Sequence, residues 1–258
     1  MISDTKMVNL EKICENYLGR NFVVASSTSL AETVKDFYGV TDDAILFCDN
    51  FSVPSLPQCD IDIKAICYKP KFGFLGEIES VKRICESNNL IFIEDFTESF
   101  SANLQIGEKY HYAGTFGNVS VCSFGDFHLY ATDDEKLADK LREASMPLDE
   151  VQKQRLHDFV FEAEAKKHER RVASANYTAL FAYLGLLNFV APLAEIEGEV
   201  ASFQMFPIRA KDSSDLLQHL CQAGVPVTQG GDFLLLPTDT TIDEQNNIAN
   251  LILKFYKE

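Results

Sequence analysis

A short apolar run that ends in two acids constrains the fold of this chain more than any other feature. The segment 90–99 has the sequence LIFIEDFTES, so four apolar residues lead directly into Glu94 and Asp95. A continuous apolar run of this length is typical of a strand buried on both faces of a parallel sheet. Open α/β sheets bind ligands at the carboxyl ends of such strands. The run therefore predicts a buried strand with acids at a ligand-binding edge, although an acid there can also cap the next helix.

Strands and helices alternate along the chain before this run. Strands are expected over 21–25, 44–48 and 63–68, and helices over 8–18, 30–40 and 76–87. Parallel βαβ units have this order and spacing. Two later strands, 119–124 and 127–132, are joined by Gly125 and Asp126 and predict a hairpin. The expected fold class is α/β, with three layers (αβα) and a mostly parallel sheet that carries one antiparallel strand.

The rest of the chain divides at Pro147 and Asp149. Before this division, a polar loop is expected after Ser99 and a helix over 135–144. After it, helices are expected over 152–187, 214–222 and 242–256, and short strands over 202–209 and 233–236. The centre of the long helix, AEAKKHERRVA, carries a run of charges that we expect on a solvated face. The pattern predicts a large domain over 1–148 and, over 149–258, the long helix with a small α+β domain.

Composition argues against several classes of partner. The formal net charge is −16 at pH 7, whereas nucleic acids and anionic membranes are bound through basic patches. No apolar run approaches the roughly 20 residues that cross a bilayer, and the start, MISDTKMVNLEK, lacks a signal-peptide pattern. The seven cysteines form no CxxC or Cys/His cluster, which fits a reducing compartment and gives no metal site. We expect a cytoplasmic protein that binds neither nucleic acid nor membrane.

Small hydroxyl residues fill the turn between the first strand and the second helix. The turn has the sequence Ser26-Ser27-Thr28-Ser29. Such residues can cap the helix, or they can help to hold a phosphate on the N–H groups at its N-terminus. Both roles are open on the sequence alone.

In their order and spacing, these segments resemble the DegT/StrS-type sugar aminotransferases, which are pyridoxal-phosphate enzymes of the aspartate-aminotransferase fold (fold type I). The resemblance covers nearly the whole chain. It rests on VASSTSLAETVKDFYGV, AICYKPKFGFLGEIESVKRICESNNLIFIED, VSVCSFGD with FHLYATDDEKLADKLREA, HERRVASANYTALF, FQMFPIRAKDSSDLLQHLCQAGVPV and FLLLPTDTTIDEQ. It implies pyridoxal phosphate or pyridoxamine phosphate as the cofactor.

The resemblance also implies which residues contact the cofactor. Asp95 matches the acid that pairs with the pyridine nitrogen, and such a carboxylate makes the ring an electron sink. Glu98 lies where the family has a glutamine beside the ring. The other residues implied are Ser27, Thr28, Ser29 and Ser123 at the phosphate, and Phe51 near the aromatic position that stacks on the ring.

The chain departs from the family at the Schiff-base lysine. The family has this lysine a few residues after its SF motif, within a loop that SFGDFHLYATDD lacks. No Lys or Arg occurs between Tyr110 and Glu135. Without an amine there, the cofactor has neither a covalent attachment nor the base that moves its proton.

His128 falls on the lysine position when the motifs are counted without a gap. Related sugar 3-dehydratases have a histidine there, which acts as base with pyridoxamine phosphate bound non-covalently. If the missing loop lies before Phe127, His128 is instead a residue of the return strand with a structural partner. His128 is therefore a candidate catalytic residue with a structural alternative.

The missing lysine decides which function we expect. We expect a degenerate, catalytically inactive homologue (a pseudoenzyme) of nucleotide-sugar aminotransferases, and the sequence leaves open whether the cofactor is kept or lost. It would act as a binding or partner subunit in polysaccharide or amino-sugar biosynthesis, with a nucleotide-sugar as ligand. The family implies a homodimer or a heterodimer with an active relative. The alternatives are a pyridoxal-phosphate sugar aminotransferase and a histidine-based sugar 3-dehydratase.

Overall fold

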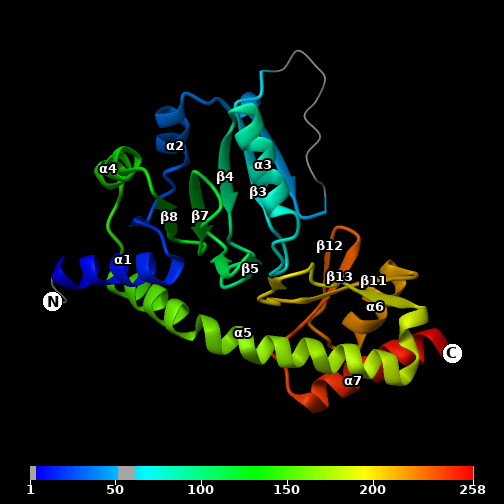
Figure 1. The fold of residues 1–258 in the computed structure, drawn as a ribbon. Helices are drawn as coiled ribbons and strands as arrows, with labels where there is room; N and C mark the ends of the chain where they lie inside the picture. The colour runs from blue at the N-terminus through cyan, green and yellow to red at the C-terminus, as the bar shows by residue number, and fades with distance from the viewer. Residues whose placement is uncertain (1–3, 52–61, 258) are drawn as a thin grey trace.

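The computed structural model describes residues 4–51 and 62–257, with side chains described from Leu10 onward (Figure 1). The helices are α1 (Asp4–Leu18), α2 (Ala31–Tyr38), α3 (Ile78–Asn88), α4 (Glu135–Ala144), α5 (Glu150–Leu184), α6 (Ser213–Gln222) and α7 (Ile242–Lys257). The strands are β1 (Phe22–Ser26), β2 (Ile45–Asp49), β3 (Ala65–Lys69), β4 (Ile91–Asp95), β5 (Asn103–Ile106), β6 (Lys109–Tyr112), β7 (Val119–Ser123), β8 (His128–Thr132), β9 (Val190–Pro192), β10 (Glu199–Val200), β11 (Phe206–Ala210), β12 (Thr228–Gly230) and β13 (Phe233–Leu236).

The main sheet has six strands in the order β1-β8-β7-β4-β3-β2. Neighbours from β2 to β7 pair in parallel, and β8 is antiparallel to both β7 and β1. The expected fold class, a mostly parallel sheet with one antiparallel strand, is confirmed. The carboxyl ends of β1, β7, β4, β3 and β2 therefore meet at one edge.

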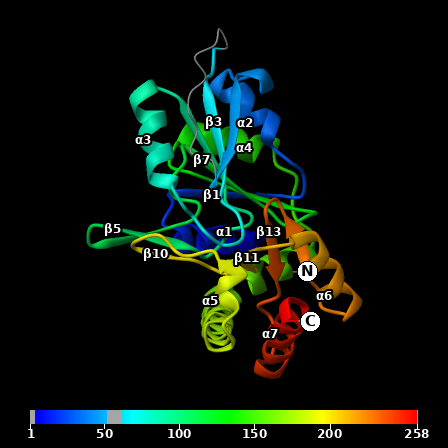
Figure 2. The ribbon, with the colours of Figure 1, turned by 90° about the vertical axis from the view of Figure 1, so that its right-hand side faces the viewer.

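Helices cover both faces of this sheet, as Figure 2 shows for α3 on one side and α2 and α4 on the other. The first face presents alternate strand residues such as Tyr68, Phe92 and Leu129 to α1, α3 and the start of α5. The second face presents residues such as Val24 and Tyr130 to α2 and α4. Because successive side chains of a strand point to opposite faces, both sets are apolar, which gives the continuous apolar runs of the sequence.

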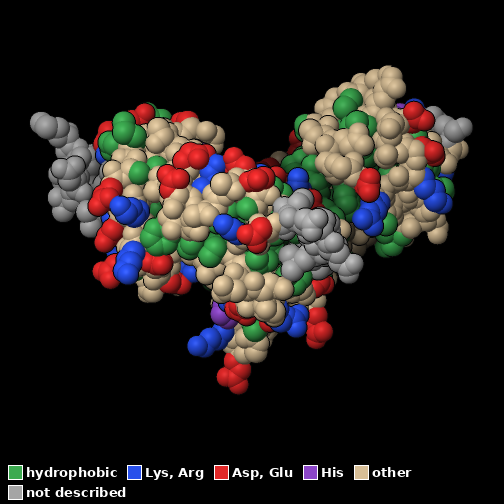
Figure 3. Space-filling view, turned by 90° about the horizontal axis from the view of Figure 1, so that it is seen from above, with side chains coloured by type: hydrophobic (Ala, Val, Ile, Leu, Met, Phe, Trp, Pro, Cys, Tyr) green, Lys and Arg blue, Asp and Glu red, His purple; other side chains and the backbone are tan. Residues whose placement is uncertain are grey.

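The long helix α5 connects this core to a second one. Asp149 caps its start with a complete capping box, in which Gln152 is the reciprocal partner. Its first half packs on the main sheet, and its second half packs on α6, α7 and the antiparallel sheet β12-β13-β11-β9. Figure 3 shows that the surface is hollowed between two lobes.

Two expectations about local structure were wrong. The segment after Ser99 is not only a polar loop, because β5 and β6 form a hairpin that projects from the body (Figure 2). Gly107 makes this possible, since its φ of +62° suits the tight turn. The charged centre of α5 is not fully solvated either. Lys167 is buried, donates to the carbonyl oxygen of Ser101 at 3.0 Å and pairs with Glu164.

The carboxyl edge of the main sheet lies beside the second core. Phe51 follows β2, and its ring centroid lies 4.7 Å from that of Phe233 in β13. A ligand at this edge would therefore meet both parts of the molecule. Among the helices that the structure describes, none is long and apolar enough to cross a membrane.

Candidate functional site

Four of the residues expected to contact a cofactor line one cavity at the carboxyl edge. The cavity has a volume of about 250 Å³. Ser29 comes from the turn before α2, Asp95 from the end of β4, Ser123 from the end of β7, and His128 from the start of β8. Strand order and register alone bring these side chains together, because β8 lies between β1 and β7 and β7 lies beside β4.

His128 is the first residue of the return strand. It lies opposite Ser26 of β1 and Ser123 of β7 in the sheet register. Its Nδ1 is 2.9 Å from the Ser123 hydroxyl oxygen. Burial lowers the pKa of His128 below its ordinary value, although the nearby Asp95 carboxylate acts in the opposite direction. The imidazole is therefore neutral at pH 7 and has a structural partner.

Both carboxylate oxygens of Asp95 have partners within the chain. One carboxylate oxygen, Oδ1, accepts hydrogen bonds from the backbone N–H of Thr97 at 3.1 Å and from its hydroxyl at 2.5 Å. The other, Oδ2, lies 3.5 Å from Lys69 Nζ, and Lys69 also lies 3.5 Å from Glu98 Oε1. The two acids expected beside a cofactor ring are thus bridged by one internal ammonium group.

Lys69 is the functional residue that sequence reasoning missed. It is the last residue of β3 and lines a second cavity of about 410 Å³ together with Lys71, and this cavity shares Phe47, Cys67 and Asp95 with the first. Burial disfavours its charged form, but the carboxylates of Asp95 and Glu98 outweigh burial and raise the pKa of Lys69. Lys69 is therefore a cation at neutral pH.

A second amine, Lys35 of α2, also lines the first cavity and is engaged in the same way. Its Nζ lies 2.6 Å from Glu32 and 2.8 Å from Asp42. Hydrogen bonds to these acids raise its pKa. Each of the two amines is therefore held as a cation by two carboxylates.

Four N–H groups in and just after the turn before α2 have acceptors within the chain. The Tyr130 hydroxyl accepts from the N–H of Leu30, the residue that precedes α2, at 2.8 Å. Three further N–H groups also donate hydrogen bonds. Ser27 donates to Met146 O (2.9 Å), Thr28 to Ser26 Oγ (3.2 Å) and Ala31 to Ser29 Oγ (3.4 Å). A phosphate bound by these four N–H groups would have to displace these acceptors.

Phe51 lies apart from the cavity residues. Its ring packs on Phe72 and Phe233, with centroid separations of 5.7 and 4.7 Å, and it lines neither cavity. Glu98 reaches the site only through Lys69. The structure therefore brings Ser29, Asp95, Ser123 and His128 together, and it places Phe51 at the junction with β13.

These contacts test whether the residues fit pyridoxal phosphate. The ring nitrogen needs a free carboxylate, the phosphate needs free N–H groups, and the aldehyde needs a neutral amine. Asp95 is paired with Lys69, four N–H groups of the turn are engaged, and Lys69 and Lys35 are both cations. The site as it is built does not fit the cofactor.

Glu94 points to the opposite face and has a structural role. Its buried carboxylate accepts from the N–H groups of Gly114, Phe116 and Gly117 and from the Ser120 hydroxyl. Burial raises the pKa of Glu94 despite these hydrogen bonds. Of these two adjacent acids, Glu94 therefore holds the loop in place, and Asp95 faces the cavity.

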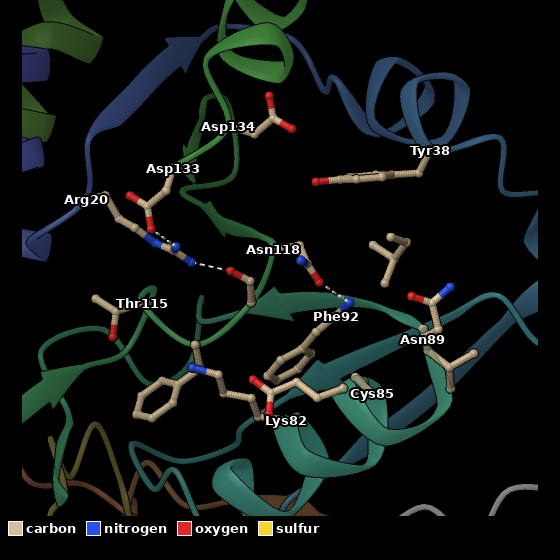
Figure 4. A pocket seen from close by; sticks show the side chains of 15 residues that line it. Arg20, Tyr38, Lys82, Cys85, Asn89, Phe92, Thr115, Asn118, Asp133 and Asp134 are labelled. Carbon is tan, nitrogen blue, oxygen red and sulfur yellow. Dashed lines mark hydrogen bonds and ion pairs between the residues drawn. The ribbon is translucent and has the colours of Figure 1, made fainter.

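A larger cavity, of about 690 Å³, lies at the opposite edge of the sheet (Figure 4). Its buried cation, Arg20, donates to Asp133 at 2.7 Å and to the carbonyl oxygens of Gly114 and Gly117. Asn118 Oδ1 accepts from the Phe92 N–H at 2.7 Å. Size alone does not make this cavity the functional site, because these polar groups already hold the loop and strands together.

Part of the region that lines the first cavity is similar to a known family. Residues 62–146 match the DegT/DnrJ/EryC1/StrS aminotransferase family, whose enzymes use pyridoxal phosphate. This segment contains Lys69, Asp95, Ser123 and His128. No curated protein matches the chain.

Solved structures share the fold over nearly the whole chain. A DegT DnrJ EryC1 StrS aminotransferase from Brucella abortus has a TM-score of 0.82 at 18% identity, covering 100% of this chain and 92% of the other. Helicobacter pylori PseC, an aminotransferase of pseudoaminic acid biosynthesis, gives 0.79 at 15%, covering 97% and 91%. Streptomyces DesV from S. venezuelae, solved with a ketimine intermediate, gives 0.78 at 14%, covering 98% and 90%. The chain therefore has the fold of these aminotransferases, and its segment 62–146 carries their family pattern.

Proposed function

We propose that this chain is a catalytically silent relative of the sugar aminotransferases, which uses their fold for binding. The observation that carries this proposal is the ion pair between Lys69 and Asp95. An aminotransferase needs that carboxylate to stabilise a protonated pyridine ring. Here the ammonium group of Lys69 carries the same positive charge as the protonated ring and occupies the ring's position beside Asp95.

Because Lys69 belongs to the same chain as Asp95, it competes strongly with a free cofactor for this carboxylate. A group attached to the same chain acts at an effective concentration in the millimolar range or above. A free cofactor has to displace it from Asp95 and then leaves the ammonium group with Glu98 as its remaining acid partner. The four engaged N–H groups of the turn act in the same direction, because phosphate binding there also breaks internal hydrogen bonds.

Lys69 does not replace the missing Schiff-base lysine. The ring nitrogen and the aldehyde carbon lie at opposite ends of the cofactor ring, so an amine that holds Asp95 is at the wrong end. A nucleophilic amine must also be neutral, whereas the acids keep Lys69 charged. A charged amine beside Asp95 therefore favours a site that no longer accepts the cofactor over a site whose catalytic lysine has moved to another strand.

A second candidate function is a histidine-based sugar dehydratase. The specific observation in its favour is that a neutral His128 lines the same cavity as Asp95. A neutral imidazole can accept a proton at pH 7. This function requires non-covalent binding of pyridoxamine phosphate beside His128.

Equilibrium dialysis of the full chain against each cofactor separates these candidates. The silent scaffold is expected to bind neither pyridoxal phosphate nor pyridoxamine phosphate stoichiometrically. Saturable binding of pyridoxamine phosphate alone, weakened in His128→Ala, supports the dehydratase. Saturable binding of pyridoxal phosphate, with absorbance at about 420 nm, contradicts the proposal.

A further inference from the structure

The centre of the main sheet is covered less completely on its second face than on its first. Ile93 of β4 and Val121 of β7 are only half-buried, whereas their chain neighbours Phe92 and Cys122, on the first face, are 1% and 0% exposed. Phe47, on the edge strand β2, is 67% exposed. Strands of a mostly parallel sheet are normally buried on both faces, so these apolar side chains border a hollow.

This hollow is the cavity of about 250 Å³ that Asp95, Ser123 and His128 line at the carboxyl edge. The apolar part of its wall includes side chains from α2, β2, β4 and β7, namely Val34, Ile45, Phe47, Ile93, Val119 and Val121. Sites for small molecules typically combine such an apolar wall with a few polar groups that fix the orientation of the ligand. The cavity therefore has the make-up of a small-molecule site.

The volume limits what the cavity can enclose. An apolar cavity of about 150 Å³ binds one benzene molecule. By the same ratio, the 250 Å³ of this cavity suits a molecule of about ten non-hydrogen atoms. A nucleotide-sugar, the ligand that the family resemblance implies, is several times larger, so the cavity does not enclose it.

The charges around the cavity are paired within the chain. Lys35 and Lys69 each lie within ion-pair distance of two carboxylates. Two cations among four acids leave an excess of negative charge, which opposes an anionic ligand. A cationic ligand would have to compete with the ammonium groups, and an ion of either sign loses hydration against an apolar wall. These charges favour an uncharged ligand.

His128 can recognise one polar group of such a ligand. Its Nδ1 is engaged with the Ser123 hydroxyl, and its other ring nitrogen, Nε2, has no hydrogen-bond partner in the part of the chain that the structure describes. In a neutral imidazole, Nε2 can donate or accept a hydrogen bond, depending on which nitrogen carries the proton. A hydroxyl, a carbonyl or a ring N–H group of the ligand suits this position.

We propose that the cavity beside Asp95 binds a small uncharged molecule that has an apolar ring or chain and one polar group near His128. This ligand class rests on the proposed function, because the cavity is open to it only while Lys69 keeps the cofactor away from Asp95. Pyridoxal phosphate and nucleotide-sugars are anionic, whereas this ligand is neutral. The chain would thus use the fold of an aminotransferase to bind a different class of molecule.

Fluorescence titration of the full chain with indole tests this inference. Indole is uncharged and aromatic, has one N–H group and is of the required size. Because the chain has no tryptophan, selective excitation reads the indole alone. We expect saturable binding with a dissociation constant below about 1 mM and an emission shifted to shorter wavelength by the apolar wall. Indoxyl sulfate, which adds an anionic group to the same ring, should bind at least about tenfold more weakly.

Two variants, each with a matched control, locate the binding. Val121→Phe fills the cavity from a half-buried strand position and should weaken indole binding at least about tenfold. Phe47→Ala removes an exposed part of the wall and should weaken it about fivefold. The controls are Val151→Phe and Phe161→Ala, the same changes at α5 positions that are 68% and 61% exposed and lie outside the cavity, and both should bind indole as the wild type does.

Circular dichroism confirms that each variant is folded, and Phe47→Ala carries the test if Val121→Phe does not fold. Absence of saturable indole binding overturns the inference, and so does indoxyl sulfate that binds as tightly as indole. Unchanged indole binding in the folded cavity variants places the indole elsewhere and overturns it as well. Each of these results leaves the proposed loss of transamination intact. Stoichiometric binding of pyridoxal phosphate contradicts the proposed function, whatever the indole titration shows.

Discussion

Lys69 Nζ lies 3.5 Å from Asp95 Oδ2, so the end of one strand neutralises the acid at the end of its neighbour. The β3–β4 register pairs Tyr68 with Glu94, which makes Lys69 and Asp95 the next neighbours along the edge. The same ammonium group also contacts Glu98. This three-residue bridge determines what the cavity can accept.

Replacing Lys69 by methionine should lower the free energy of unfolding by about 0.5–1 kcal/mol, because the pairs are partly exposed and solvent screens them. Urea unfolding measures the change. Lys71→Met is the matched control, since Lys71 lines the same cavity and makes no ion pair in the described residues. An equal loss in both variants, or a loss for Lys69→Met that does not shrink at high salt, contradicts the account.

Glu94 and Asp95 should differ sharply in their effect on stability, although they are adjacent. Glu94→Ala leaves three buried N–H groups and the Ser120 hydroxyl without their acceptor, so we expect a loss of about 3 kcal/mol. Asp95→Ala removes an acid that faces a cavity and should cost no more than about 1 kcal/mol. Chemical denaturation of both variants tests this, and a reversed order would show that the assignment of the two faces is wrong.

The hydroxyl of Tyr130 should protect the start of α2. Tyr130→Phe removes the acceptor of the Leu30 N–H, and the expected loss is about 1 kcal/mol. Hydrogen exchange at the Leu30 amide should accelerate, while exchange in α4, which packs on the same face, should not change. Unaltered exchange at Leu30 would mean that another group caps the helix.

The pH dependence of His128 has a defined sign. Because burial holds its pKa below the ordinary value of 6.5, the folded chain takes up this proton at a lower pH than the unfolded chain. Its contribution to stability is therefore present above pH 6.5 and is lost as the pH falls through the lowered pKa. An NMR titration should give a midpoint below 6.5, and Asp95→Asn should lower it further. A midpoint above 6.5 contradicts the structure.

Periodicity predicted most of the fold. The apolar runs predicted the buried strands, and the turn residues Gly125 and Asp126 predicted the antiparallel return strand, because local side-chain patterns decide both. The β5–β6 hairpin was missed because each of its strands has only four residues, so the alternation of polar and apolar residues in NLQI and KYHY is too short to stand out. The burial of Lys167 was missed because it depends on a carbonyl group 66 residues away.

The candidate site was predictable only in part. Asp95, Ser123 and His128 could be placed at one edge because each lies at the end of a strand. Lys69 was missed although it directly follows the strand predicted over 63–68, because the sequence alone does not show which strand pairs with that one. The adjacency of β3 and β4 in a parallel sheet was the signal that could have found it. The hydrogen bond from the Leu30 N–H to Tyr130 likewise depends on the spatial contact between β8 and the turn before α2.

The most direct test of the central claim is site-resolved labelling of lysines in the full chain after exposure to pyridoxal phosphate and borohydride. The account predicts that peptide mass spectrometry finds Lys69 and Lys35 labelled no more than Lys12, whose side chain is 63% exposed. Stoichiometric labelling of Lys69 or Lys35, protected by pyridoxamine phosphate, would show a working cofactor site and contradict the account.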